Sequence, residues 1–345
     1  MGNVTIKFLA KELNLSIAAI SKALRDSHEI SPATKKRVQD LAKQLNYVPN
    51  PYASSLRHRK SKTIAVVLPE VADSFFSEAI NGIEAVAIKK DYHVLLYLTH
   101  ESIAREEAIL KDFQSGRVDG ILMSISAETN CYQHIHSLFS KDMPIVFFDR
   151  ICNEIKTTKV ITDDFDCGYN AAAHLIKTGC QKINFLSISE SLGITTMRKM
   201  GCMKACQDFN MENAFQSLLL SNKETESNYS MIKSLLKKKS RPDGIIASVE
   251  KLSLDVYFAC RELGLSIPDD LQLIGFSNLS SVSLLAPALT TITQPAFEIG
   301  ETAASTLIKA IEKKSFVLVD EHITIPSKFI IRGSTKSIVQ EKSPD

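Results

Sequence analysis

Apolar side chains recur with helical spacing at the start of the chain. Ile6, Leu9, Ala10 and Leu13 fall at i, i+3, i+4 and i+7, which places them on one face of a helix. Thr5, directly before them, is a residue type that caps helix N-termini through its hydroxyl. The pattern therefore predicts a short amphipathic helix that begins after Thr5.

Two further helical stretches follow within the first 50 residues. In the segment 16–26, Ile20 and Leu24 lie four residues apart and share the inward face, and Ser16 supplies an N-cap. Ser31-Pro32 marks the start of the third helix, whose apolar stripe is Val38, Leu41 and Leu45. Because a three-residue turn, 14–16, separates the first two helices, the pattern predicts a three-helix helix-turn-helix unit.

From residue 62 onward the pattern changes to short apolar runs separated by helical stretches. Such runs are typical of parallel strands buried on both faces, so they predict an α/β body in which helices cover parallel sheets. The expected strands are 64–68, 93–98, 120–124, 144–149, 183–187, 217–220, 244–248 and 271–277, and the expected helices include 76–90 and 104–115.

Two of these segments recur at nearly the same distance along the chain. Arg117–Ser124 is echoed 124 residues later by Arg241–Ser248. The strand that ends at Asp149 is echoed 128 residues later by the strand that ends at Ser277. The nearly equal offsets indicate a body made of two lobes of one design.

Length and composition limit the class of protein. The 345 residues are 44% hydrophobic and 23% charged, which is typical of a soluble globular protein with more than one domain. No apolar run approaches the ~20 residues that a membrane-spanning helix needs, and residues 1–7 lack the apolar core of a secretory signal. We therefore expect a cytoplasmic protein without a membrane partner, whose seven cysteines are reduced thiols.

The charge is unevenly distributed along the chain. Residues 1–62 hold 12 Lys or Arg against 4 Asp or Glu, whereas the remaining residues hold 29 against 35. A basic module on a mildly acidic body is the electrostatic pattern of a nucleic-acid reader that carries a second domain. A basic tail that binds acidic lipid is the alternative, but it does not need the three ordered helices.

The motifs of the first 60 residues point to a specific family. They are Val4-Thr5-Ile6, Leu15-Ser16, Ile20–Leu24, Ile30–Lys35 and Leu45–Asn50. This set resembles the DNA-binding domain of the lactose-repressor and galactose-repressor (LacI/GalR) family. The resemblance continues through the body in the segments 73–76, 148–150, 196–201, 262–265 and 289–295.

The resemblance implies a helix-turn-helix DNA-binding domain followed by a two-lobed, periplasmic-binding-protein-like effector domain. We expect the DNA-binding domain at 1–49 and a hinge at 50–61. The N-terminal lobe is expected at 62–162 and 293–325, and the C-terminal lobe at 163–292 and 326–340.

The resemblance assigns DNA contacts to the start of the second helix. Ile17, Ala18 and Lys22 match the positions that read the major groove, and Arg25 lies on the same outer surface. Lys22 stands where the family has arginine, and a flexible point charge discriminates guanine less well than a two-donor fork. The positions that match the family's phosphate contacts are Thr5, Ser16, Ser21, Ser31, Thr34 and Tyr47.

The hinge is expected to fold only when something holds it. The segment 52–57 has room for fewer than two helical turns, far below the ~12 residues at which an isolated helix becomes marginal. The resemblance implies a hinge helix on operator DNA, with Asn50 and Ala53 among its DNA contacts and Leu56 as a wedge in the minor groove.

Effector residues are expected just beyond the strands. In open parallel sheets a ligand binds outside the carboxyl ends of the strands, so two facing sheets enclose it between the lobes. Aromatic faces with arginine and carboxylate groups suit a polyhydroxylated ligand. The candidates are Asp73, Phe75, Phe76, Asp149, Arg150, Asp163, Arg198 and Ser277.

Each candidate has an alternative. Phe75 and Phe76 are equally consistent with core positions, and Asp149-Arg150 with a loop salt bridge. Arg198 matches a family arginine that contacts effector. The family commonly has asparagine-aspartate at Val249-Glu250 and aspartate at Ser277, so the resemblance does not name the ligand.

The sequence favours a ligand-responsive repressor of carbohydrate-utilisation genes that binds a palindromic operator as a homodimer. Its expected partners are double-stranded operator DNA and a sugar or sugar derivative, and whether that ligand induces or corepresses stays open. A sugar-binding solute receptor is the alternative. We expect no enzymatic activity, because no nucleophile or phosphate-binding motif is present. No cofactor or metal is expected, and Cys131, His134 and His136 are assigned to a solvated helix.

Overall fold

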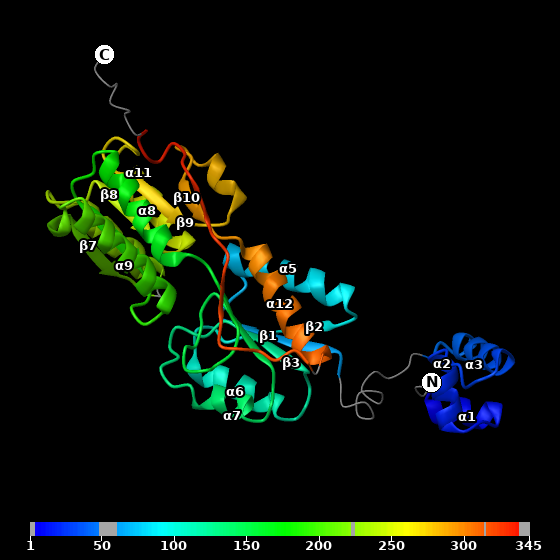
Figure 1. Ribbon diagram of the computed structural model, residues 1–345. Coiled ribbons are helices and arrows are strands. Elements are labelled where there is room, and N and C mark those ends of the chain that lie inside the picture. The colour runs from blue at the N-terminus through cyan, green and yellow to red at the C-terminus, as the bar shows by residue number, and fades with distance from the viewer. Residues whose placement is uncertain (1–3, 48–60, 222–224, 314, 338–345) are drawn as a thin grey trace, which may run out of the picture. The chain divides into compact units, whose positions relative to one another are not determined.

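The computed structural model describes residues 4–47, 61–221, 225–313 and 315–337. Contacts divide the chain into two compact units, Met1–Ser61 and Lys62–Asp345, which Figure 1 colours from dark blue to red along the chain. Each unit has its own core, so each is described by itself.

In the described residues 4–47, the first unit forms three helices: α1 (Ile6–Leu13), α2 (Ile17–Leu24) and α3 (Pro32–Gln44). Each begins after the predicted N-cap, because the hydroxyls of Thr5, Ser16 and Ser31 accept hydrogen bonds from backbone N–H groups of the first turn. The predicted helix-turn-helix unit is confirmed. Its buried core contains Leu9, Ala10, Ile20, Ala23, Val38 and Ala42.

The second unit contains two six-stranded sheets that follow one plan. Sheet A has the order β11 (His322–Thr324), β5 (Lys159–Ile161), β4 (Ile145–Phe148), β3 (Gly120–Met123), β1 (Thr63–Leu68) and β2 (His93–Leu98). Its strand pairs are all parallel. One face packs against α5 (Ser74–Lys89) and α12 (Ala296–Glu312), and the other against α6 (Ile103–Phe113) and α7 (Gln133–Phe139). We call this sheet and these helices the N-terminal lobe.

Sheet B repeats this arrangement. Its order is β12 (Lys328–Ile330), β10 (Thr290–Thr293), β9 (Gln272–Phe276), β8 (Gly244–Ala247), β6 (Ile183–Ser187) and β7 (Phe215–Leu219). The strand pairs are parallel except β10 with β12. The covering helices are α8 (Asp164–Lys177) and α9 (Gly193–Asp208) on one face and α10 (Thr225–Leu236) and α11 (Glu250–Leu263) on the other. Together they form the C-terminal lobe. Short 3-10 turns lie at Glu212–Ala214 and Ser280–Leu284.

The chain passes between the lobes three times: from β5 to α8, from β10 to α12, and from β11 to β12. Figure 1 shows these segments between the cyan-green and the green-yellow parts of the body. The first and the third lie side by side, because the Ser327 N–H donates to Asp163 at 2.7 Å. The predicted α/β fold with two parallel-sheet lobes is confirmed.

One strand differs from the prediction. The apolar run 93–98 forms β2, but β2 lies at the edge of sheet A and is not buried on both faces. Leu95 and Leu96 are 40% and 45% exposed. The same apolar pattern suits a strand inside the sheet, which helices cover on both faces, and an edge strand that another chain covers. The pattern therefore does not distinguish a central strand from an edge strand.

Two further observations concern the length of the helices and the state of the cysteines. No helix in the described part of the chain is long and apolar enough to cross a membrane. The seven cysteines are free thiols, and six of them are buried, including Cys202 and Cys206 on the core-facing side of α9.

Candidate DNA-binding and effector sites

The outer surface of α2 carries the predicted base-reading residues. Ile17 is 46% exposed and Ala18 is also exposed, whereas Ile20 and Ala23 on the opposite face are buried. The amphipathic pattern therefore fixes which side of the helix is available. Lys22 is half-buried and pairs with Glu29, which lowers the pKa of that carboxyl. Lys22 must exchange this partner to reach a base.

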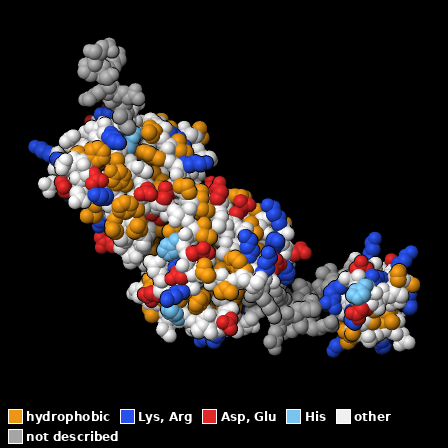
Figure 2. Space-filling model, in the orientation of Figure 1, with side chains coloured by type: hydrophobic (Ala, Val, Ile, Leu, Met, Phe, Trp, Pro, Cys, Tyr) orange, Lys and Arg blue, Asp and Glu red, His pale blue; other side chains and the backbone are white. Residues whose placement is uncertain are grey.

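Three of the six predicted phosphate contacts are the N-caps of α1, α2 and α3. Thr5, Ser16 and Ser31 accept from the backbone N–H groups of Phe8, Ala19 and Thr34 at 3.3, 3.1 and 3.3 Å. Each capping oxygen is engaged as an acceptor, which leaves the hydroxyl hydrogens of Thr5 and Ser16 available to a phosphate. The Ser31 hydroxyl also lies 2.9 Å from the Thr34 hydroxyl, and these two groups share one hydrogen bond. The positive end of each helix dipole adds to this preference for anions. Figure 2 shows Lys and Arg side chains (blue) around the visible face of this unit.

The other predicted DNA contacts differ in their surroundings. Arg25 donates to the carbonyl and hydroxyl of Ser21 at 3.1 and 3.3 Å, so these two side chains form one exposed group. Tyr47 is half-buried against the core, and burial raises its pKa. Asn50, Ala53 and Leu56 lie outside the described residues.

In the second unit, charged residues from both lobes gather at the carboxyl ends of the strands. Asp73 and Ser74 follow β1, Asp149 follows β4, Asp164 opens α8, Arg198 lies in α9, and Glu250 opens α11. Hydrogen bonds and electrostatic interactions link these residues in one group. We call Asp73, Ser74, Asp149, Asp164, Arg198 and Glu250 the inter-lobe cluster.

Glu250 joins the two lobes directly. Its carboxylate accepts from the Ser74 backbone N–H at 3.1 Å and from the Ser74 hydroxyl, and it also accepts from the Ser277 hydroxyl at 3.2 Å. Ser74 opens α5, where Asp73 accepts from the Phe75 N–H at 2.9 Å. The N-termini of α5 and α11 therefore meet at one carboxylate, which suits the positive ends of both helix dipoles.

A second set of inter-lobe bonds lies beside this contact. Asn278, which follows β9, donates through Nδ2 to Glu78 on α5 at 2.8 Å. The Asn278 side chain also binds the backbone of Gln294, which lies just before the chain crosses into α12. Its Oδ1 accepts from the Gln294 N–H at 3.1 Å, and its Nδ2 donates to the Gln294 carbonyl at 2.7 Å. At a separate point, the Ser191 hydroxyl donates to the Ala127 carbonyl at 3.2 Å.

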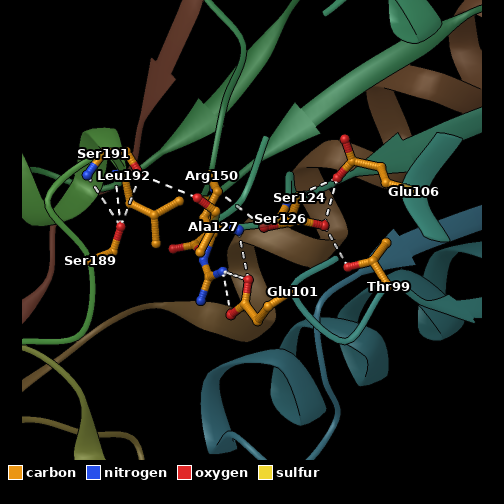
Figure 3. A network of polar contacts seen from close by, with 11 residues as sticks. Thr99, Glu101, Glu106, Ser124, Ser126, Ala127, Arg150, Ser189, Ser191 and Leu192 are labelled. Atoms are coloured by element: carbon orange, nitrogen blue, oxygen red, sulfur yellow. Dashed lines mark hydrogen bonds and ion pairs between the residues drawn. The ribbon is translucent and has the colours of Figure 1, made fainter. Parts of the chain in front are cut away.

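Asp149 and Arg150 occupy a buried turn after β4. Asp149 is 6% exposed and has a left-handed backbone (φ 59°), and burial raises its pKa to about 7 against the opposing attraction of Arg150 and Arg198. Arg150 Nη1 donates to both carboxylate oxygens of Glu101 at 2.8 Å, as Figure 3 shows. The Arg150 Nε lies 3.8 Å from Asp149, so Glu101 is the main partner of this guanidinium.

Arg198 is held rigidly on the C-terminal lobe. It is 3% exposed, its Nε donates to Asp164 at 2.6 Å, and its Nη1 donates to the Ser248 carbonyl at 2.8 Å. The guanidinium lies over the Phe276 ring, 4.0 Å from the centroid. Its Nη2 is buried without a hydrogen-bond partner among the described residues. Arg198 is therefore placed by the protein with one donor uncommitted.

Three predicted effector residues lie elsewhere or serve the core. Phe75 and Phe76 are buried in the core of the N-terminal lobe, which agrees with the alternative that the sequence left open. The Arg150 guanidinium lies 5.6 Å from the centroid of the Phe76 ring. Asp163 accepts from the Ser327 N–H at 2.7 Å and from the Cys167 thiol at 3.3 Å, so it holds the crossing between β11 and β12.

A buried glutamate supports the loop after β3. Glu106 is fully buried and accepts from Ser126 N and Oγ at 2.8 Å, and from Thr129 Oγ1 at 2.9 Å. Its Oε1 also lies 2.8 Å from His134 Nε2. Figure 3 shows Ser126 between Glu106 and Thr99. The assignment of His134 to a solvated helix face was wrong, because its side chain is 9% exposed and pairs with Glu106.

Sequence reasoning missed the residues that hold the candidates in place. Glu101 lies 49 residues before Arg150, and Glu250 lies 176 residues after Ser74. One signal in the sequence could have pointed to Glu250: the family commonly has aspartate at this position, and this chain has glutamate. Within the described part of the chain, no group of three His, Cys, Asp or Glu side chains is placed to hold a metal ion.

Two protein-family profiles match the chain. Residues 5–50 match the profile described as bacterial regulatory proteins, lacI family. Residues 61–333 match the profile described as periplasmic binding proteins and sugar binding domain of LacI family.

Individual relatives cover nearly the whole chain. The ribose operon repressor of Halalkalibacterium halodurans is 30% identical over 333 residues, which is 96% of this chain and 97% of the relative. Catabolite control protein A of Priestia megaterium is 27% identical over 336 residues, which is 97% of this chain and 100% of the relative.

Solved structures agree with this grouping. A LacI family transcriptional regulator from Enterococcus faecium with bound ribose is 28% identical, with a TM-score of 0.71 over 81% of this chain and 100% of that chain. The lac repressor dimer bound to operator and an anti-inducer shares the fold at 19% identity, with a TM-score of 0.84 over 97% of this chain and 100% of that chain. The chain belongs to the LacI family of bacterial regulatory proteins.

Proposed function

We propose that the protein is a ligand-responsive transcription repressor of carbohydrate-utilisation genes, which binds a palindromic operator as a homodimer. The carrying observation is the pairing of a basic helix-turn-helix unit with a body whose two lobes bring charged residues together at the ends of parallel strands. The relatives named as repressors support this function, and a regulator of genes works in the cytoplasm, where we place the protein.

The roles of the individual residues belong to this proposal. Ile17, Ala18 and Lys22 read the major groove, and the capping hydroxyls of α1, α2 and α3 contact phosphates. Arg198 and Asp149 take part in effector binding. The division expected from the sequence, 1–49, 50–61, 62–162 with 293–325, and 163–292 with 326–340, is part of the same proposal.

The proposed mechanism is a population shift. Effector binding changes the inter-lobe contacts at Ser74, Glu250 and Asn278. The lobes of the two protomers are then reoriented, and the two hinge segments move apart. In this proposal the hinge helix expected at 50–61, which lies largely outside the described residues, then melts and Leu56 leaves the minor groove. The solute-receptor alternative has no use for a helix-turn-helix unit, and an enzyme is not supported, because the relatives are regulators.

A selection from random DNA tests the DNA-binding function. We expect the full-length protein to enrich inverted repeats and to lose affinity steeply with salt, because phosphate contacts release counterions. A chain that starts at Lys62 is expected to enrich nothing. Equal enrichment by both chains would contradict the proposal.

A point variant tests the reading helix in the full-length protein. Ala18→Glu places a negative charge at the exposed start of α2, and we expect operator affinity to fall by about 100-fold or more. Gln39→Glu is the matched control, since it adds the same charge to the exposed surface of α3. The prediction fails if both variants retain the DNA equally.

A further inference from the structure

The loop between α2 and α3 places a negative charge beside the reading helix. Residues 1–62 hold four acidic residues, and two of them, Asp26 and Glu29, lie in this loop. A carboxylate near the DNA opposes the attraction between a basic protein and the phosphates. General affinity for DNA therefore does not account for an acidic side chain at this place.

Backbone and core contacts turn Glu29 toward α2. The Ser27 N–H donates to the Lys22 carbonyl at 3.0 Å, and the Ser27 hydroxyl accepts from the Glu29 N–H at 3.4 Å. The next residue, Ile30, packs against the core of the first unit. The loop is thus held on both sides of Glu29, so the fold sets the position of this carboxylate.

The Glu29 carboxylate pairs with the Lys22 ammonium. In this pair the Lys22 side chain is 35% exposed and the Glu29 side chain 51%, so both charged groups are accessible. An ion pair this exposed adds little to stability. Its location is the informative feature, because Lys22 is the one charged residue among the predicted base readers Ile17, Ala18 and Lys22. A donor and an acceptor therefore stand together on the surface that the proposed function turns toward DNA.

The second acidic residue of the loop serves a different contact. Asp26 pairs with Lys35 on α3 at 2.7 Å, and the Lys35 ammonium also donates to the Asp26 carbonyl at 3.1 Å. Lys35 is not a predicted base reader, and its side chain is only 19% exposed. Asp26 thus fastens the loop to α3, whereas Glu29 stays with a base reader.

A G·C base pair offers a partner to each charge of the Lys22–Glu29 pair. In the major groove guanine presents the acceptors O6 and N7, and cytosine presents its N4 amino donor beside them. Lysine can donate to the guanine acceptors, and glutamate can accept from the cytosine amino group. In an A·T pair, adenine has one acceptor where guanine has two, and thymine presents an acceptor and a methyl group where cytosine has its donor. A G·C pair therefore complements the two charges better than an A·T pair does.

We propose, building on the proposed function, that Glu29 is a specificity-determining residue and that Lys22 and Glu29 together read one G·C base pair. On the operator each side chain exchanges the other for a base: the Lys22 ammonium donates to guanine, and the Glu29 carboxylate accepts from the N4 amino group of cytosine. Lysine alone is a flexible point charge, and the added acceptor supplies discrimination that it lacks. On sequences without this base pair the ion pair stays closed, and Glu29 repels nearby phosphates.

Removal of single functional groups from the DNA tests the two contacts. An inverted repeat that the full-length protein enriches from random DNA supplies the duplex, and Lys22→Ala identifies the base pair at which base preference is lost. At this pair cytosine is replaced by 2-pyrimidinone, which lacks the N4 amino group and leaves guanine unchanged. We expect the loss of affinity to be about 10-fold larger for the wild type than for Glu29→Ala, since the weaker base pairing affects both proteins alike.

Two controls separate the Glu29 contact from other effects. In the companion duplex, 7-deazaguanine removes the N7 acceptor, so the wild type and Glu29→Ala should lose affinity alike, whereas Lys22→Ala should not. Asp26→Asn removes a carboxylate from the same loop, and asparagine tolerates the left-handed backbone of this residue (φ 56°). This variant should respond to 2-pyrimidinone as the wild type does.

The joint reading of a G·C pair is overturned if the wild type and Glu29→Ala lose equal affinity on removal of the cytosine amino group. It is also overturned if Lys22→Ala alters base preference at no G·C pair, or if Asp26→Asn loses the response as Glu29→Ala does. Each of these results leaves the enriched inverted repeat intact. A full-length protein that enriches no inverted repeat contradicts the proposed function itself.

Discussion

Asp149 holds its proton through a pH range in which exposed aspartates have lost theirs. Burial raises its pKa to about 7, although Arg150 and Arg198 favour the charged form, and Asp73 and Asp164 add to the increase. The unfolded chain has a value of about 3.9 at this residue. Because the folded state binds the proton more tightly, this stabilisation is complete below about pH 4 and is lost as the pH rises through about 7.

Asp149→Asn is therefore expected to flatten the pH dependence of the free energy of unfolding. Titration of one proton changes the free energy of unfolding by at most about 1.4 kcal/mol per pH unit. We therefore expect the wild type to lose stability relative to the variant as the pH rises from 4 to 7, by no more than this amount per unit. Asparagine tolerates the left-handed backbone of this residue, which keeps strain out of the comparison. Parallel curves from urea titrations at pH 4, 5, 6 and 7 would show that the carboxyl does not titrate in this range.

At the scale of elements, paired glycines let helices pack closely in both lobes. A Cβ on Gly168 of α8 would lie 2.0 Å from the Arg198 carbonyl, and one on Gly201 of α9 would lie 2.0 Å from the Phe165 carbonyl. In the N-terminal lobe, Gly82 of α5 and Gly300 of α12 face backbone atoms in the same way, at 2.1 and 2.0 Å. The α8–α9 contact thus sets the position of the helix that carries Arg198.

Gly168→Ala is expected to displace α9 and Arg198 with it. Overpacking against backbone atoms cannot be relieved by a rotamer change, so the free energy of unfolding should fall by about 3 kcal/mol, and the effector response should weaken. Gly193→Ala is the matched control, because Gly193 opens α9, the helix that Gly168→Ala is expected to displace, and a Cβ on Gly193 meets nothing within 4 Å. Equal stability of the two variants in chemical denaturation would refute this account of the contact.

These contacts mark what the sequence could and could not predict. The strands β2 and β6 have the predicted bounds, because an apolar run is a local signal. The bond between Glu250 and Ser74 joins residues 176 apart, and no local pattern encodes it. The same holds for the Glu106–His134 pair, since a glutamate on a helix is expected at the surface until its partners from another loop are known.

At the scale of the whole molecule, the exposed edge of sheet A suggests where a second copy docks. Leu95 and Leu96 of β2 are 40% and 45% exposed, and Ile88 on the neighbouring helix α5 is 67% exposed. Natural proteins usually protect an edge strand with charge or a covering element, whereas β2 presents apolar side chains there. Since a helix-turn-helix unit covers one half-site, a palindromic operator needs two copies, and this edge offers a surface for pairing.

Leu96→Glu is accordingly expected to weaken the dimer and, through it, operator binding. A side chain at the centre of an interface commonly contributes about 2 kcal/mol or more, so the dimer dissociation constant should rise by about 30-fold or more. Met200→Glu is the matched control, because Met200 is 50% exposed on α9 of the C-terminal lobe. Sedimentation velocity at several protein concentrations measures the dimer, and DNA retention is measured on the same samples. Leu96→Glu could dissociate the dimer and still leave palindromic DNA bound as tightly as before. That outcome would show that single chains read the operator. It would also show that changes in the inter-lobe contacts do not reach the DNA through the dimer.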